Sequence, residues 1–138
     1  MFDLFTPQQL ATLRALANRI IPADEFPGGW EGGAEGYLRR QFAGDLRQLV
    51  ETYRAGLDGL DAEARATGSP FAAMAPVEQD QLLVRVEQGA VATQWAVDPA
   101  AFFRMAVTHV AEGYYSDPGN GGNRDGAAWR MIGFEVRG

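Results

Sequence analysis

The chain has 138 residues, a formal net charge of −6 at neutral pH, 46% hydrophobic residues and no cysteine. The length predicts one domain with a single core, and the acidic balance argues against binding to nucleic acid or anionic membranes, which needs clustered cations. Without cysteine, the chain has no disulfides, thiol catalysis, iron–sulfur clusters or cysteine-ligated zinc.

The sequence contains no export signal or membrane span that we recognise. No apolar stretch approaches the roughly 18 residues of a membrane helix, so direct membrane insertion is not expected. The opening residues, MFDLFTPQQL, lack a basic region and an apolar signal core. Arg39 and Arg40 are paired, but they lie inside an amphipathic pattern. As written, the sequence predicts a cytoplasmic protein; a periplasmic location would require a leader that was removed, or export together with a partner.

The first expected helix begins at Pro7, because Thr6 can cap it and Gln9 can close a capping box. Its apolar face repeats at helical spacing until Pro22 ends it. The next stretch, residues 23–33, is rich in glycine and is expected to be a loop pinned by Phe26 and Trp30.

A long helical pattern follows from Ala34 to Leu60. The pair Gly44-Asp45 is expected to break it, with Asp45 capping the second part and Gln48 three residues later. Gly68-Ser69-Pro70 is a firm stop.

Two further helices are expected in the second half. One begins at Pro76, and its buried stripe is expected to contain Val77, Leu82, Leu83 and Val86. The other begins at Asp98-Pro99 and runs toward Tyr115. No alternating strand pattern of useful length appears. The sequence therefore predicts one all-α domain over residues 1–138, a small bundle of about five helices, with an extended, ordered arm over residues 113–138.

The arm contains the run GYYSDPGNGGNRDGAAWRMIGF, from Gly113 to Phe134. Neither helix nor strand periodicity fits residues 116–126, so we expect a shaped loop. Long ordered loops in compact domains are usually functional. The aromatic and aliphatic residues of the run predict that it docks, either on its own domain or on another protein.

Two local patterns suggest chemistry, and each has a simpler explanation. His109 and Glu112 share a helix face and could hold a metal or a proton, yet a metal site needs more ligands, so a core or partner-facing histidine is favoured. The glycine-rich run 119–126 resembles a phosphate-binding loop, but no strand precedes it and no GK[ST] follows. Turn-forming glycines explain that run better.

Two groups of acidic residues are interpreted as solvated surface. The first loop carries Asp24, Glu25, Glu31 and Glu35, with docking of a basic surface as the second interpretation. Asp58, Asp61 and Glu63 are interpreted as a solvated helix face. No serine–histidine–aspartate arrangement can be assembled, so these residues do not indicate an independent catalyst.

Three segments together resemble the subunit 3 family of gluconate 2-dehydrogenase. They are FTPQQLATLRALANRIIPADEFPGG, then YRAGLDGLDAEARATGSPFAAMAPVEQDQLL, and finally EGYYSDPGNGGNRDGAAWRMIGF. The last is similar to the family's most distinctive motif, G-Y-[FY]-S-D-P-x-x-G-G-N-x-x-G-x-x-W-x-x-I-G-[FY]. The resemblance spans nearly the whole chain.

This resemblance implies a non-catalytic small subunit. Such subunits bind, stabilise and help mature an FAD-dependent dehydrogenase large subunit of the glucose–methanol–choline type, which oxidises sugars or sugar acids. The resemblance places FAD and the catalytic residues in that partner, assigns no cofactor to this chain, and allows a cytochrome in the wider complex. Many members leave the cell by the twin-arginine route, whereas this sequence shows no such leader. The alternatives are a free-standing metal- or small-molecule-binding helical enzyme using His109 and Glu112, and a transient maturation chaperone of the flavoprotein.

The resemblance also assigns roles within the arm. The residues expected to contact the partner are Tyr114, Tyr115, Asp117, Pro118, Asn123, Arg124, Trp129, Arg130, Ile132 and Phe134. Those expected to shape the loop are Gly113, Gly121, Gly122, Gly126 and Gly133. Arg124 and Arg130 are the expected donors of charge-assisted hydrogen bonds across the interface.

Overall fold

The structure, a computed structural model, describes residues 4–116, and over this range the chain forms five α-helices and no strand, as predicted. The helices are α1 (Pro7–Ile20), α2 (Glu35–Ala43), α3 (Val50–Arg65), α4 (Pro76–Glu87) and α5 (Pro99–Ser116). Short helical turns lie between them: η1 (Trp30–Ala34), η2 (Arg47–Leu49) and η3 (Phe71–Ala73). Residues 117–138, which make up most of the predicted arm, lie outside the described range.

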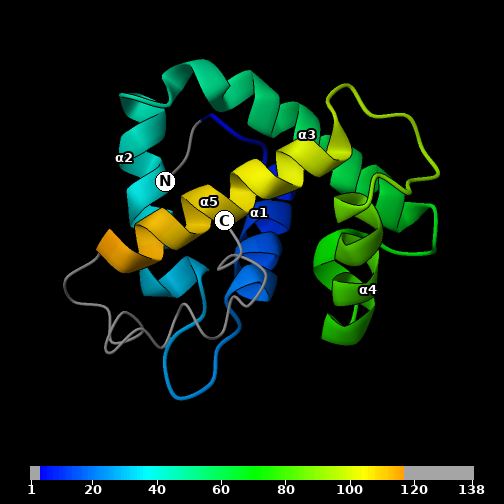
Figure 1. Cartoon of the computed structure of the whole chain (residues 1–138), viewed down its shortest axis with the longest axis horizontal. Coiled ribbons are helices and arrows are strands. Elements are labelled where there is room, and N and C mark those ends of the chain that lie inside the picture. The colour runs from blue at the N-terminus through cyan, green and yellow to red at the C-terminus, as the bar shows by residue number, and fades with distance from the viewer. Residues whose placement is uncertain (1–3, 117–138) are drawn as a thin grey trace.

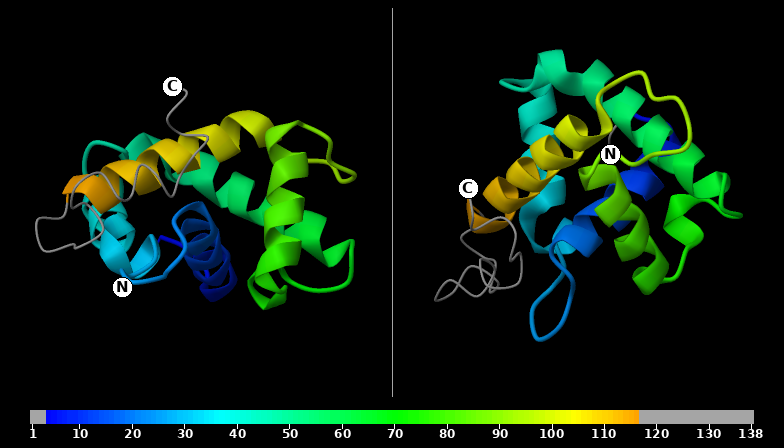
Figure 2. Two further views of the ribbon diagram at one scale, coloured as in Figure 1. Left: turned by 60° about the horizontal axis from the view of Figure 1, so that its bottom comes forward. Right: turned by 45° about the vertical axis from the view of Figure 1, so that its right-hand side comes forward.

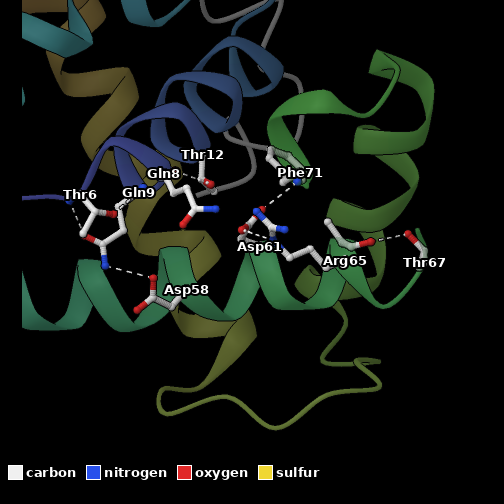
Figure 3. Close-up of polar contacts among 10 residues, drawn as sticks. Thr6, Gln8, Gln9, Thr12, Asp58, Asp61, Arg65, Thr67 and Phe71 are labelled. Atoms are coloured by element: carbon white, nitrogen blue, oxygen red, sulfur yellow. Dashed lines mark hydrogen bonds and ion pairs between the residues drawn. The ribbon is translucent and has the colours of Figure 1, made fainter. Parts of the chain in front are cut away.

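Two predicted helix starts are confirmed in detail. At α1, the Thr6 hydroxyl accepts from the Gln9 backbone N–H at 3.0 Å, and Gln9 Oε1 accepts from the Thr6 N–H at 2.9 Å. Gln9 also donates to Asp58 of α3 at 3.0 Å, which ties the start of α1 to its neighbour (Figure 3). At α5, the Asp98 carboxylate accepts from the Ala100 N–H at 3.0 Å. Both caps satisfy donors that a helix N-terminus leaves unpaired.

Helix α5 lies across the middle of the molecule, with α2 near its C-terminal end and α4 near its N-terminal end (Figures 1 and 2). It contacts all four other α-helices and η1. A series of edge-to-face aromatic pairs links Phe5, Phe42, Tyr53 and Phe102, with ring centroids 4.9–5.6 Å apart. This arrangement joins the N-terminus, α2, α3 and α5 in one core, and aromatic rings prefer such geometry.

The expected cap at Asp45 is wrong. The break itself is confirmed, since α2 ends at Ala43, but the chain then makes a turn and the short η2 before α3 begins at Val50. The residue at the N-cap of α3 is Leu49, which makes no side-chain capping bond. Because η2 leads directly into α3, its own backbone turn replaces a capping side chain.

The expected burial of Val77 in α4 is also wrong, since 62% of its surface is exposed. The buried face of α4 instead consists of Gln79, Leu82, Leu83 and Val86. This face starts at Gln79 because its amide donates to the Phe71 carbonyl oxygen of η3 at 2.7 Å, which satisfies a buried polar group. Val77 lies off that face.

The expected loop over residues 23–33 ends in a helical turn that the sequence did not predict. Trp30 begins η1, and its side chain is buried with 7% exposure. Gly29 lies so close to α1 that a Cβ there would overlap the Ala17 carbonyl oxygen. The glycines therefore let this turn press against the core, rather than giving the segment freedom.

Candidate partner-binding surface

The end of α5 positions the first residues of the predicted arm. Gly113 and Tyr114 lie within the helix and are buried. The Tyr114 hydroxyl donates to the Pro27 carbonyl oxygen at 2.8 Å, and its ring lies against Gly32 of η1. A Cβ at Gly113 would lie 2.8 Å from Cβ of Tyr37, so this glycine permits close helix packing. The structure thus gives both residues roles inside this domain, which differ from the predicted partner-contact and loop-shaping roles.

The remaining predicted interface residues are mostly beyond the described range. Tyr115 is half-buried near the end of α5, and its contact with a partner stays a prediction. The same holds for the residues outside the structure's described part: Asp117, Pro118, Gly121, Gly122, Asn123, Arg124, Gly126, Trp129, Arg130, Ile132, Gly133 and Phe134.

A mostly polar cavity of about 380 Å³ lies where α5 ends at Ser116. Two acidic residues that line it are paired: Glu31 with Arg14 at 2.7 Å and Glu35 with Arg39 at 2.7 Å. These ion pairs lie at the surface, where water screens them. The arrangement fits the interpretation of a solvated acidic loop better than a dedicated docking site for a basic partner.

His109 and Glu112 make hydrogen bonds to different partners and do not form a shared metal or proton site. The His109 ring is 9% exposed, shares a 2.7 Å hydrogen bond through Nδ1 with the Tyr53 hydroxyl, and stacks on that ring. Glu112 instead accepts from the Tyr37 hydroxyl at 2.8 Å. Among residues 4–116, no group of three potential metal ligands lies together. His109 is therefore a core histidine with a satisfied nitrogen, as the simpler explanation predicted.

Because His109 is buried, we expect the stability of the folded chain to depend on pH. Desolvation lowers the pKa of His109 below its ordinary value, although the Glu112 charge acts in the opposite direction. The unfolded chain therefore takes up a proton near pH 6.5 while the folded chain does not, and stability should fall as the pH drops below about 6.5. The slope cannot exceed about 1.4 kcal/mol per pH unit for one group. Urea unfolding between pH 5 and 7.5 measures how the free energy of unfolding changes with pH. His109→Gln should remove this pH dependence. If the variant keeps the same slope, another group causes it.

An apolar groove of about 300 Å³ lies between α1, α4 and α5. Its floor contains Ile20, Leu83 and Phe103, which are nearly fully buried, and Val84 at its rim is 51% exposed. Arg19 and Asp80 close one side with two hydrogen bonds of 2.9 Å, one from Nε and one from Nη2. The sequence did not predict this groove, because its residues come from three separate segments.

Glu63 of α3 was expected to lie on a solvated helix face, and this expectation is wrong. It is 2% exposed rather than solvated. Its carboxylate accepts from the backbone N–H groups of Ala92 and Thr93, from the Thr93 hydroxyl and from the Trp95 indole. Trp95 packs over Gly59, where a Cβ would lie 2.6 Å from the ring. One buried acid thus holds the connection between α4 and α5 in place.

The comparison with protein families assigns the chain to a family. A family model described as gluconate 2-dehydrogenase subunit 3 matches residues 7–136. The chain belongs to the gluconate 2-dehydrogenase subunit 3 family. No curated protein and no solved structure matches the chain. The family's description is that of a dehydrogenase subunit, which fits an accessory role for this all-α domain. Within residues 4–116, no helix of this family member has the length and apolar character to cross a membrane.

Proposed function

We propose that this chain is the non-catalytic small subunit of an FAD-dependent sugar or sugar-acid dehydrogenase, and that it binds and stabilises the large subunit that carries FAD. The observation that supports this most strongly is the family match over residues 7–136. It covers nearly all of the residues that the structure describes and most of residues 117–138. A subunit of this kind needs a stable scaffold and a surface for its partner.

The described residues are consistent with a binding role. The one histidine of the chain shares a hydrogen bond with the Tyr53 hydroxyl in the core. The charged residues around the end of α5 are largely paired with each other. What this domain does offer is α5, which packs against the four other α-helices and after whose last residue the aromatic motif continues in the sequence. The interface is therefore proposed to involve residues 117–134, with Trp129 as its anchor.

Trp129→Ala is expected to weaken binding to the large subunit by about 2 kcal/mol, roughly 30-fold, because interfacial tryptophans commonly anchor complexes. Co-purification of the tagged chain with a yellow partner of larger mass, followed by titration of the two purified subunits, measures the change. The matched control is Trp95→Phe, a tryptophan whose indole bonds to Glu63 within this domain. Equal binding by wild type and Trp129→Ala would remove that residue from the interface.

Stoichiometry separates a permanent subunit from a transient maturation chaperone. If the chain is a subunit, the mature active dehydrogenase contains it in a fixed ratio. If it acts only during maturation, the active enzyme lacks it. A purified large subunit with bound FAD and full activity after removal of this chain would contradict the proposal of a lasting subunit.

A further inference from the structure

Helix α4 lies at one side of the molecule and carries an exposed stripe along its length (Figure 1). Within residues 4–116, three large apolar side chains are exposed, and two of them belong to this stripe: Val77 at 62% and Val84 at 51%. Seven residues separate them, which places them on the same face of the helix, two turns apart. Gln81 lies between them and is also exposed. Apolar side chains repeated on one exposed face indicate a surface that packs against another element.

Two opposite charges border this stripe. Glu78 and Arg85 line the same polar cavity of about 190 Å³, so both lie on one side of α4. They are about 10 Å apart along the helix, which is too far for them to pair with each other. None of the ion pairs within residues 4–116 includes either residue. Each therefore has its charge available to another molecule.

We propose that α4 packs against α4 of a second copy of this chain, in an antiparallel dimer with two-fold symmetry. In such a dimer every contact occurs twice, because residue i of one copy meets residue j of the other and the reverse. When the symmetry axis passes between Gln81 and Leu82, Glu78 of each copy lies level with Arg85 of the other. The symmetry then forms two ion pairs at once.

The same position of the axis also matches the stripe itself. Val77 of each copy comes within about 3 Å, measured along the helix, of Val84 in the second copy, so all four valines are covered. The two Gln81 side chains meet at the axis, and an amide can both donate to and accept from its own copy. One register therefore pairs the apolar, amide and charged positions together, as a self-complementary surface requires.

The other side of α4 does not oppose this arrangement. Asp80 lies near the axis, but it already pairs with Arg19 at 2.9 Å. The two copies of Glu87 are about 17 Å apart along the helix in this register. A contact between two 12-residue helices is smaller than a standard interface, so the dimer is expected to be reversible. It uses none of residues 117–134 and is compatible with the proposed binding of the large subunit.

Disulfide formation in the full-length chain tests the inference, because the sequence contains no cysteine of its own. Gln81→Cys should form a disulfide-linked dimer under mild oxidation, since its two copies meet at the axis. The matched control is Gln88→Cys, which is exposed at the end of the same stripe. Its two copies are about 20 Å apart along the helix, beyond the reach of a disulfide. Non-reducing electrophoresis measures the linked fraction, and equal linking of both variants, or of neither, would overturn the inference.

Charge reversal provides a second measurement on the full-length chain without cysteine. Glu78→Arg and Arg85→Glu should each weaken the dimer about tenfold, because each change replaces two ion pairs with two repulsions. The chain that carries both changes restores opposite charges and should dimerise like the wild type. Arg47→Glu, at an exposed arginine of η2, repeats the charge change of Arg85→Glu away from α4 and should have no effect. Sedimentation equilibrium measures the association. A wild-type chain that stays monomeric, or a double variant that stays weakened, contradicts the inference.

The experiments also recognise a different occupant of the stripe. If Gln81→Cys forms no link and Val84→Asp instead reduces co-purification of the large subunit, the stripe binds that partner and the inference is wrong. Both dimer assays contain this chain alone. Their failure is therefore distinguishable from failure of the proposed binding to the large subunit, which co-purification measures.

Discussion

Tyr114→Ala is expected to lower the free energy of unfolding by about 3–5 kcal/mol, the range for truncating large buried aromatic side chains. Tyr114 is fully buried at the end of α5. Its ring fills the space beside Gly32 of η1, and its hydroxyl satisfies the Pro27 carbonyl oxygen at 2.8 Å. The truncation therefore opens a cavity and also leaves a backbone acceptor without its partner. Urea unfolding followed by circular dichroism measures the loss.

Two variants separate the contributions of the ring and the hydroxyl. Tyr114→Phe keeps the ring and should cost about 1 kcal/mol, the usual net value of one hydrogen bond. Gly32→Ala places a methyl group against the ring and should destabilise the wild type, because the added Cβ would overlap the Tyr114 ring. In the Tyr114→Ala background the same change should cost much less. Additive effects in this cycle would show that the two residues are not in contact.

Local chemistry explains which elements could be predicted from the sequence. Thr6 and Asp98 cap helices through atoms two or three residues away, so the helix starts are encoded within a few neighbouring positions. The all-α class followed from apolar spacing over five segments. Val77 shows the limit of this reasoning. A valine at the helix start fits an apolar pattern, but the buried face was decided by a bond between Gln79 and Phe71.

The candidate site was harder to predict, because it depends on tertiary contacts between residues that lie far apart in the sequence. Tyr114 carried a motif that suggested a partner contact, yet its environment depends on Pro27 and Gly32, which are far away in the sequence. The groove beside Val84 needs α1, α4 and α5 together. No spacing rule within one helix could have found either feature. Glycine-rich stretches next to a tryptophan, as at Trp30, were the one signal of close packing that the sequence did offer.

Glu63→Ala is expected to destabilise the domain by about 2–4 kcal/mol. Hydrogen bonds to a charged group contribute about 1.5–3 kcal/mol each, but Ala92 is exposed and Thr93 only partly buried, so water replaces part of what is lost. The change removes the acceptor of the Ala92 and Thr93 N–H groups and of the Trp95 indole. Residues 88–98 should then open first. Hydrogen exchange at Ala92 and Thr93 should accelerate more than exchange within α1. The matched control is Asp58→Ala on the same helix, which loses one bond at an exposed carboxylate and should cost less than about 1 kcal/mol.

Acid should reproduce part of this effect in the wild type. Burial acts to raise the pKa of Glu63, but the hydrogen bonds from Thr93, Ala92 and Trp95 outweigh it and leave the pKa below its ordinary value. A carboxylate with a lowered folded pKa contributes stability above about pH 4.5, and this contribution is lost as the pH falls further. As the pH falls, the loss from His109 begins at about pH 6.5 and that from Glu63 only at about pH 4.5, and the two single variants assign each loss to its residue. Glu63→Gln should reduce the pH dependence of the free energy of unfolding only below about pH 4.5. If the pH dependence were unchanged in this variant, the Glu63 carboxylate would not be the group that holds the α4–α5 connection against α3.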